Sequence, residues 1–371
     1  MKKIKIPWAK PELGEEELNE VIDSFKSNWL TMGPKVNKLE HEVSIFLEVP
    51  YAIAISNGTV ALDLVLKAIG VEPGDEVIVP AMTYFATASS VSYQNAVPVF
   101  VDIEKETFNL DPDRIPEAIT EKTKAIIFID YGGNPSNYDA IAKVGQKYNI
   151  KVLQDGAQSL GAFYKGRPMG AQTETSTMSF HAAKVMTTIE GGMIFTHNES
   201  LKEDILSRRN QGESKGGKYI HITLGTNARM TDLTAGIGLA QFKKLPVFIK
   251  QRRRVGEKYN KLFSQSKDKI FFPKERVDCK NAYFFYPILV EDRDRVSYVL
   301  REKYGIDTRI AYPMPLYKQE VFASGKLKYR KMECPIAEEV TSKILNLPIF
   351  PSMTDDMIEQ VCRAIFKEIE K

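Results

Sequence analysis

One lysine, Lys184, lies in a stretch whose residue types could perform carbonyl chemistry. Its immediate neighbours are apolar, a Ser-Phe-His triplet (179–181) precedes it, and a Glu-Gly-Gly turn (190–192) follows it. Two short β-like runs flank the stretch and would hold the lysine on a loop. Desolvation disfavours an ammonium ion, so a lysine in apolar surroundings can lose its proton near neutral pH and attack a carbonyl group. The same stretch is also compatible with an ordinary solvated loop lysine.

Other polar and aromatic residues come directly after strand-like runs. Asp155 ends the run 151–155 and is followed by Gly-Ala-Gln158-Ser, and Tyr84 follows the run 76–80. A carboxylate and an aromatic ring in these places could serve a site. Asp155 could equally be a helix cap, and Tyr84 could be a core residue.

A further candidate is the turn Ser56-Asn57-Gly58-Thr59, which joins the apolar run 51–55 to a helical pattern over 61–69. A strand, a small polar turn and a helix together present free backbone N–H groups and the positive end of a helix dipole to a phosphate. The turn matches neither GxGxxG nor a Walker loop, so nucleotide binding of those kinds is not indicated. An ordinary N-cap on a core helix is the alternative.

The elements that would position these residues alternate between strand and helix. Two N-terminal helices are expected at 11–25 and 36–47, joined by a Trp-Leu-Thr loop that could pack a corner or wall a site. Apolar strands are expected at 51–55, 76–80, 97–102, 125–130 and 151–155, and helices at 84–95, 113–119, 137–148 and 201–209. Such alternation indicates an α/β protein with a mostly parallel sheet covered by helices on both faces, in which ligands collect at the carboxyl ends of the strands.

The character of the chain changes in its last third. A small-residue helix at 233–245 continues as a long helix to about 263, and its basic run at 250–254 reads as a solvated face. Strands at 282–290 and 306–310, helices at 293–303 and 355–369, and a proline-rich loop region between them suggest a smaller α+β domain. We therefore expect a large domain over 1–245, including the N-terminal helical segment, and a linking helix with the small domain over 246–371.

Composition excludes several classes of function. With 51 basic and 48 acidic residues the net charge is only +3, so no overall field favours nucleic acid or anionic lipid. No run is long enough to span a bilayer and none resembles a signal peptide, so we expect a cytoplasmic protein. Three cysteines and four histidines, without metal-binding spacing, make a disulfide framework or a metal site unexpected.

Together, a reactive lysine, a carboxylate at a strand end, an aromatic ring and a helix-start phosphate cradle fit pyridoxal 5′-phosphate (PLP). Its aldehyde condenses with a lysine, its ring nitrogen must stay protonated, its ring needs stacking and its phosphate needs an anchor. At this point the chain resembles the DegT/DnrJ/StrS sugar aminotransferases, which are PLP enzymes of fold type I. The motifs that carry the resemblance are Ser56–Thr59, Pro73–Pro80, Asp155–Gln158, Ser179–His181 with Lys184, Glu190–Gly192 and Asn227–Met230.

The resemblance implies a role for each cofactor contact. Lys184 would bind the cofactor covalently and move protons, Asp155 would pair with the ring nitrogen, and Gln158 would lie near the ring hydroxyl. Tyr84 would stack on the ring. The phosphate would be held by Gly58, Thr59 and Ser179 and by Asn227 of a neighbouring subunit, which implies a homodimer with shared sites. Candidate residues of the sugar pocket are Trp29, Thr31, His181, Arg229 and Tyr312.

The activity implied is transfer of an amino group from glutamate or glutamine to a keto-sugar linked to a nucleoside diphosphate, with pyridoxamine 5′-phosphate (PMP) as the intermediate form. The runs 187–192 and 29–34 resemble members that act on 4-keto-6-deoxy sugars, which we favour. Asn227-Ala228-Arg229 and the run 312–316 resemble members that act at carbon 3. A further alternative, from another class, is a regulator that binds PLP without turnover.

Overall fold

The computed structural model describes residues 4–265 and 270–369, and its centre is an eight-stranded sheet. Its strands are β1 (Tyr51–Ile55), β2 (Glu76–Pro80), β3 (Val97–Val101), β4 (Thr123–Ile129), β5 (Lys151–Asp155), β8 (Thr175–Ser179), β9 (Gly192–Thr196) and β12 (Arg330–Lys331). They lie in the order β1-β9-β8-β5-β4-β2-β3-β12. Only β9 runs antiparallel to its neighbours β1 and β8; the other pairs are parallel. The sheet is thus mostly parallel, as predicted.

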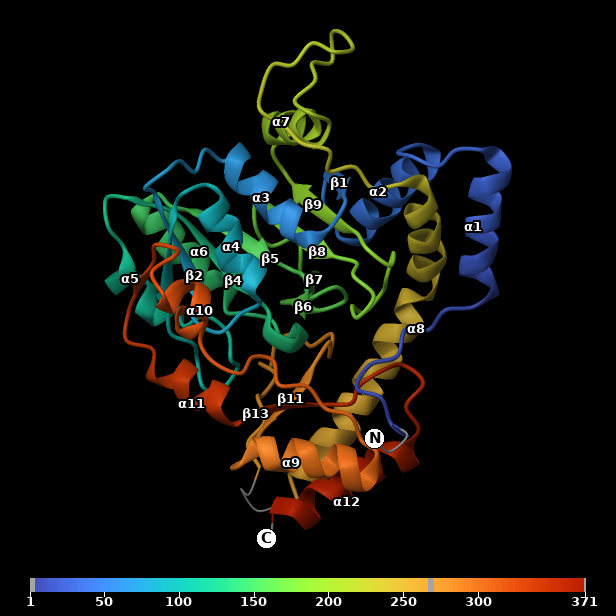
Figure 1. Ribbon diagram of the computed structural model, residues 1–371, viewed down its shortest axis with the longest axis vertical. Helices are drawn as coiled ribbons and strands as arrows, with labels where there is room; N and C mark the ends of the chain where they lie inside the picture. The colour runs from blue at the N-terminus through green and yellow to red at the C-terminus, as the bar shows by residue number, and fades with distance from the viewer. Residues whose placement is uncertain (1–3, 266–269, 370–371) are drawn as a thin grey trace.

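Helices cover both faces of this sheet (Figure 1). They are α2 (Pro34–Phe46), α3 (Gly58–Ala68), α4 (Phe85–Tyr93), α5 (Ile115–Ala118), α6 (Tyr138–Tyr148) and α7 (Glu199–Arg209). Helix α1 (Glu15–Ser27) lies away from the sheet and packs on the long helix α8 (Asp232–Phe263). Side chains alternate across each strand, so Val77 and Val79 of β2 join one hydrophobic cluster while Ile78 joins another. Because both faces are buried, these strands read in the sequence as continuous apolar runs.

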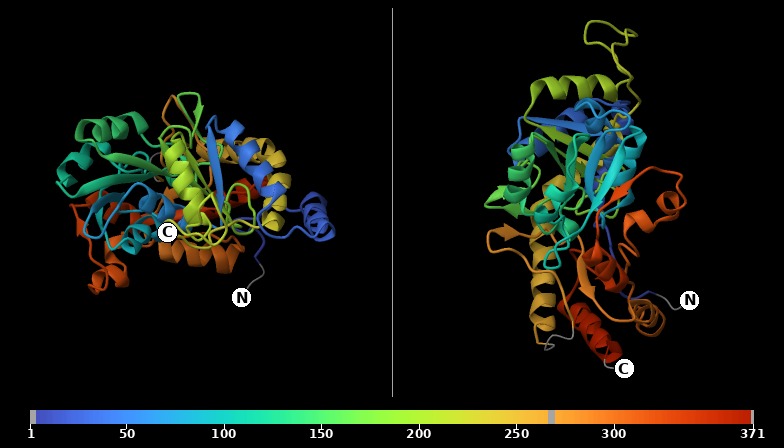
Figure 2. Two further views of the ribbon diagram at one scale, coloured as in Figure 1. Left: turned by 90° about the horizontal axis from the view of Figure 1, so that it is seen from above. Right: turned by 90° about the vertical axis from the view of Figure 1, so that its left-hand side faces the viewer.

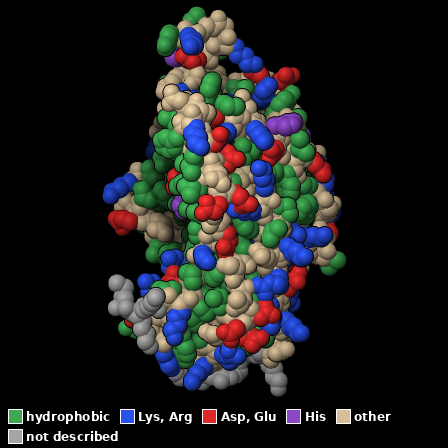
Figure 3. Space-filling view, turned by 90° about the vertical axis from the view of Figure 1, so that its right-hand side faces the viewer, with side chains coloured by type: hydrophobic (Ala, Val, Ile, Leu, Met, Phe, Trp, Pro, Cys, Tyr) green, Lys and Arg blue, Asp and Glu red, His purple; other side chains and the backbone are tan. Residues whose placement is uncertain are grey.

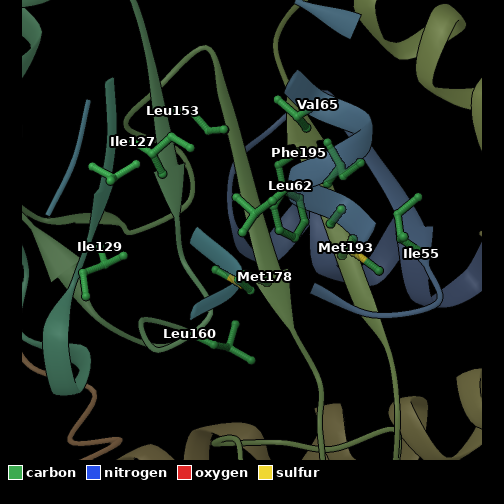
Figure 4. Close-up of a cluster of buried hydrophobic side chains, with 14 of the residues drawn as sticks. Ile55, Leu62, Val65, Ile127, Ile129, Leu153, Leu160, Met178, Met193 and Phe195 are labelled. Carbon is green, nitrogen blue, oxygen red and sulfur yellow. The ribbon is translucent and has the colours of Figure 1, made fainter. Parts of the chain in front are cut away.

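The larger cluster lies between α3 and the antiparallel end of the sheet. Leu62 and Val65 of α3 point toward Met178 of β8 and toward Met193 and Phe195 of β9 (Figure 4). This packing fixes the start of α3 against the end of β8. Consequently the turn before α3 and the loop after β8 open at the same edge of the sheet.

The C-terminal part packs on a long helix. Its elements are α8 (Asp232–Phe263), β11 (Tyr286–Leu289), α9 (Arg293–Val299), a π-helical turn (Leu300–Tyr304), α10 (Glu320–Ala323), α11 (Pro335–Lys343), β13 (Ile344–Leu347) and α12 (Asp355–Ile369). Three short strands, β6 (Phe163–Tyr164), β7 (Arg167–Pro168) and β10 (Cys279–Lys280), form a separate small sheet. The second half of α8 joins α9 and α12 in their own hydrophobic cluster at the lower end of the molecule (Figures 1 and 2). The domain boundary at residue 245 stays a prediction, since α8 runs across it at Pro246.

Two C-terminal strands differ from the prediction. Residues 306–310 form no strand, because Ile306 pairs with Ile6 while Arg309 pairs with Asn346, so the two ends have different partners. The expected strand 282–290 shortens to β11, because the backbone N–H groups of Ala282 and Phe285 bond to the loop carbonyls of Gly133 and Gly132. The sequence also gave no signal for α11 and β13.

In the described ranges, no helix combines the length and apolarity that crossing a membrane requires. The cytoplasmic location stays a prediction. Within the same ranges, no group of three or more His, Cys, Asp or Glu side chains is arranged to hold a metal ion.

Candidate active site

The loop between β8 and β9 carries Lys184, and hydrogen bonds within its own backbone fix its shape. Phe180 N–H donates to Gly191 O at 2.8 Å, and Thr188 N–H donates to Phe180 O at 2.9 Å. Lys184 N–H donates to His181 O at 2.9 Å, which makes a tight turn. Since β8 and β9 are adjacent antiparallel strands, the lysine is fixed at the carboxyl end of β8.

A cavity of about 490 Å³ opens at this edge of the sheet. It receives residues from the ends of several strands, as expected for a parallel sheet. The predicted site residues that line it are Gly58, Thr59, Tyr84, Asp155, Gln158, Ser179, His181, Lys184 and Tyr312. Segments far apart in the sequence therefore meet in one place.

Asp155, the last residue of β5, is buried in this cavity. Its Oδ2 accepts a hydrogen bond of 2.8 Å from Thr87 Oγ1, and its Oδ1 accepts one of 3.2 Å from Ala157 N–H. Burial raises the pKa of this carboxyl group, against the opposing effects of both hydrogen bonds and of the Lys184 charge. The side chain is thus fixed in orientation and points at the space that Lys184 also lines.

Desolvation lowers the pKa of the Lys184 amine to about 8, although the negative charge of Asp155 acts in the opposite direction. Its Nζ lies 4.5 Å from the centroid of the Phe284 ring, and no described residue forms a hydrogen bond or ion pair with it. With this pKa about a tenth of the amine is neutral at pH 7, far more than for an ordinary lysine, so it can act as a nucleophile and as a proton carrier.

The N-terminus of α3 also lines the cavity, next to the end of β8. Asn57 caps the helix, its Oδ1 accepting from Val60 N–H at 2.9 Å. Among the described residues, no partner accepts from the N–H groups of Gly58 and Thr59, which line the cavity. In this corner, a Cβ on Gly58 would lie 3.0 Å from Ser179 Cβ, a contact so tight that Ser179 would have to shift. The corner offers backbone donors and a helix dipole to an anion.

Gln158 and the two tyrosines form a connected group. Gln158 Oε1 accepts from Gly132 N–H at 2.7 Å, and its Nε2 donates to Tyr312 Oη at 3.3 Å. The Tyr84 and Tyr312 rings lie 6.3 Å apart between centroids, and Tyr84 is 60% exposed. Tyr84 therefore has a free aromatic surface beside the cavity.

Other predicted residues lie elsewhere. Trp29 is 53% exposed, and Thr31 is exposed with its carbonyl accepting from Asp232 N–H at 3.2 Å. Asn227 is exposed, and Arg229 bonds to Asn210. None of these four lines the cavity of its own chain within the described ranges. His181 stands at the rim, with Nε2 3.8 Å from Glu190 Oε1.

Several residues of the site have no signal in the sequence. Thr87 orients Asp155, Phe284 covers Lys184, and Trp8 and Arg309 line the cavity from the two ends of the chain. The Thr87 contact could have been suspected only from its place in the helix that follows Tyr84. The positions of Trp8 and Arg309 depend on how the N-terminal segment pairs with the C-terminal part.

The residues present fit PLP. A lysine with a lowered pKa, a buried carboxylate and a corner of unpaired N–H groups are the donors and acceptors that its aldehyde, ring nitrogen and phosphate need. A nicotinamide would not use the lysine. The geometry is therefore that of a PLP site.

Comparison with known proteins agrees with this chemistry. The chain matches the DegT/DnrJ/EryC1/StrS aminotransferase family over residues 11–366. It is 35% identical to GDP-perosamine synthase from Escherichia coli O157:H7, with 97% of each chain covered. It is also 35% identical to UDP-2-acetamido-2-deoxy-3-oxo-D-glucuronate aminotransferase from Pseudomonas aeruginosa, with 90% of each chain covered.

A solved structure supports both fold and cofactor. NtdA from Bacillus subtilis, crystallised with bound cofactor PMP, superposes with a TM-score of 0.90 at 29% identity, covering all of this chain and 86% of that one. The predictions of a fold type I architecture, of a transaminase and of its cofactor are thereby confirmed. The chain belongs to the DegT/DnrJ/EryC1/StrS aminotransferase family.

Proposed function

We propose that this protein moves an amino group from glutamate or glutamine to a keto-sugar linked to a nucleoside diphosphate, most simply a 4-keto-6-deoxy sugar. The observation that carries the proposal is that Lys184 and Asp155 line one cavity, the first with a lowered pKa and the second buried and oriented. The names of two relatives, a GDP-perosamine synthase and an aminotransferase of a UDP-linked 3-oxo sugar, support a nucleotide-sugar acceptor.

Bound PLP would supply an electron sink for the carbanion that forms when an amino acid loses its Cα proton. Lys184 Nζ would accept that proton and donate it again later in the transfer of the amino group. A base is most effective when its pKa lies near the working pH, and a value of about 8 satisfies this condition. Phe284 keeps water away from one side of the amine.

Asp155 would keep the ring nitrogen of the cofactor protonated, because a carboxylate raises the pKa of an adjacent base. Thr87 holds the carboxylate in one orientation, and the N–H groups of Gly58 and Thr59, with Ser179, would hold the phosphate. Gln158 is held in place by hydrogen bonds with Gly132 and Tyr312 and would contact the ring hydroxyl of the cofactor.

The preference for carbon 4 rests on the runs 187–192 and 29–34. The two relatives have equal identity to this chain and are named for different sugars, so they do not distinguish the two positions. The test is to incubate the purified protein, PLP and glutamate with a panel of 3-keto and 4-keto sugar nucleotides and to identify the amino sugar by mass and NMR. Amination of 3-keto substrates alone would reverse the preference.

A PLP-binding regulator is the rival to be excluded. An enzyme is expected to change its visible spectrum from the PLP to the PMP form when glutamate or glutamine is added. Lys184→Ala should abolish this change and all turnover while the circular dichroism spectrum stays that of the wild type. A wild-type spectrum unmoved by either donor would support the regulator, and turnover by Lys184→Ala would contradict the role of this lysine.

We also propose a homodimer in which Asn227 completes the partner's phosphate site. Asn227 is exposed and does not line the cavity of its own chain. The loop that projects above α7 carries the exposed apolar residues Tyr219, Ile222 and Leu224 (Figure 1). On the side that carries α1, hydrophobic side chains lie between the charged ones (Figure 3), and Phe25 is 64% exposed. Such surfaces are typical of subunit contacts.

A mixing experiment tests the shared site. Lys184→Ala and Asn227→Ala subunits are each expected to be weakly active or inactive alone. In a hybrid dimer, one site combines Lys184 of one subunit with Asn227 of the other and is intact, so activity should reappear after mixing and reassociation. A monomeric protein, or hybrids without recovery, would contradict the proposal.

A further inference from the structure

Arg309 is the one arginine among the described residues that line the cavity. The remaining basic side chains there are Lys184, which is needed for the chemistry, and His181 at the rim. The substrates of the proposed reaction are anionic, because the donor carries carboxylates and the acceptor a diphosphate. Arg309 is therefore a candidate to bind one of these anionic groups.

The backbone of Arg309 is fixed in place. Arg309 N–H donates to Asn346 O at 3.0 Å, and Asn346 N–H donates to Arg309 O at 2.8 Å. The guanidinium lies over the ring of Trp8, 5.4 Å from its centroid. The side chain is thus guided toward the cavity while half of it remains exposed.

The charge of Arg309 is only partly balanced. Its Nη1 lies 3.2 Å from the carboxylate of Asp307, but Arg301 Nη1 lies at the same distance from that carboxylate. Two guanidinium groups share one carboxylate, so the three residues together keep one positive charge. That charge remains available to a ligand anion.

We propose that Arg309 binds a carboxylate of the amino-acid donor, an inference that rests on the proposed function. A planar guanidinium fork matches the two oxygens of a carboxylate. The cavity of about 490 Å³ must also hold the cofactor. An amino acid needs less of the remaining space than a nucleotide-linked sugar does. The cation that Arg309 adds to the cavity lining is therefore matched to the smaller substrate.

The experiment measures the two half-reactions of the PLP-loaded protein separately. Stopped-flow absorbance gives the apparent Kd for glutamate and glutamine in the first half-reaction, and for the nucleotide sugar in the second. Arg309→Gln should weaken donor binding about 10- to 100-fold, the loss expected for a charge-assisted contact, and change acceptor binding less than about 2-fold. Arg309→Lys should recover part of the loss. Equal losses for both donors identify the α-carboxylate, and a loss for glutamate alone identifies the side-chain carboxylate.

The control variant is Arg301→Gln, which removes the other partner of Asp307 but not a residue of the cavity lining. Asp307 then balances Arg309 alone, so donor binding should weaken, but by less than in Arg309→Gln, because the guanidinium at the cavity remains. Weaker acceptor binding with unchanged donor binding in Arg309→Gln would overturn the inference and assign the arginine to the diphosphate. Equal losses in both half-reactions, or no loss in either, would overturn it as well.

A second readout does not require transamination. Trp8 lies under the guanidinium, so binding of glutarate, a dicarboxylate without an amino group, should change its fluorescence in the wild type and not in Arg309→Gln. If no donor changes the visible spectrum but glutarate still binds through Arg309, the proposed function fails while carboxylate binding by Arg309 stands. If donors react normally and glutarate binds equally to both proteins, the inference fails alone.

Discussion

Thr87 Oγ1 donates a 2.8 Å hydrogen bond to Asp155 Oδ2, and both side chains are buried. Thr83 Oγ1 lies 2.8 Å from the same threonine oxygen. Since the Thr87 proton is directed to Asp155, the proton between the two threonines must come from Thr83. The pair of hydroxyl groups thus forms a short chain that ends on the one carboxylate expected to contact the cofactor ring.

Thr87→Val should lower kcat about 10- to 100-fold, because a hydrogen bond to a buried charge is worth about 1.5–3 kcal/mol. The bond lowers the pKa of Asp155, so its loss raises that pKa further. The acidic limb of the rate profile should therefore move to higher pH. Thr83→Val, which removes only the second hydroxyl, should have a smaller effect. A kcat unchanged in Thr87→Val would show that another contact orients Asp155.

The strands of this site could be predicted, but contacts such as Thr87 with Asp155 could not. Strands β1, β2 and β5 have the predicted bounds, and for β1 and β2 the reason is that a largely buried strand leaves an apolar run in the sequence. The order of the strands, by contrast, decides which side chains meet. Thr87 and Asp155 are 68 residues apart and come from elements that have no shared sequence pattern.

In the C-terminal part, even fewer of the contacts that position site residues could be predicted from the sequence. Arg309 reaches the cavity because Ile306 pairs with Ile6 and Arg309 pairs with Asn346, two contacts that no local pattern encodes. Trp8 then packs under the arginine. Resemblance to a family indicated the cofactor residues, since these lie in motifs. Residues held by long-range pairing lie outside motifs and needed the structure.

Capture of PLP by the apoprotein should depend on pH through Lys184. The amine reacts in its neutral form, and its pKa is lowered from 10.5 to about 8. The second-order rate constant should therefore rise about tenfold per pH unit up to pH ~8 and then level off. Asp155 raises this pKa, so Asp155→Asn should move the plateau to lower pH. Stopped-flow absorbance measures both profiles, and a plateau near pH 10 would contradict the desolvated amine.

Gly58→Ala should weaken binding of PLP but not of pyridoxal, which lacks the phosphate. The added Cβ would lie 3.0 Å from Ser179 Cβ, in the corner where the N–H groups of α3 begin. Either Ser179 shifts or the corner narrows, and both changes weaken the contacts expected for the phosphate. We expect a loss of about tenfold in PLP affinity, the scale of one net hydrogen bond to a charged group. Equal losses for PLP and pyridoxal, measured by equilibrium dialysis, would indicate a general distortion instead.

Asp232→Ala should destabilise the protein without acting on the chemistry directly. Its carboxylate, in a residue 1% exposed, accepts from Val36 N–H at 2.9 Å and from Lys35 N–H at 3.1 Å, so the first residue of α8 caps the start of α2. Alanine leaves a buried N–H without a partner, which should cost about 1–3 kcal/mol. The thermal unfolding midpoint of the apoprotein should fall accordingly. Asp232→Asn keeps one acceptor oxygen, so its midpoint should fall about half as far. Thr231→Ala, at an exposed cap of α8, should cost about 1 kcal/mol. A midpoint unchanged in Asp232→Ala, together with lost activity, would show that this residue serves the site and not the α2 contact.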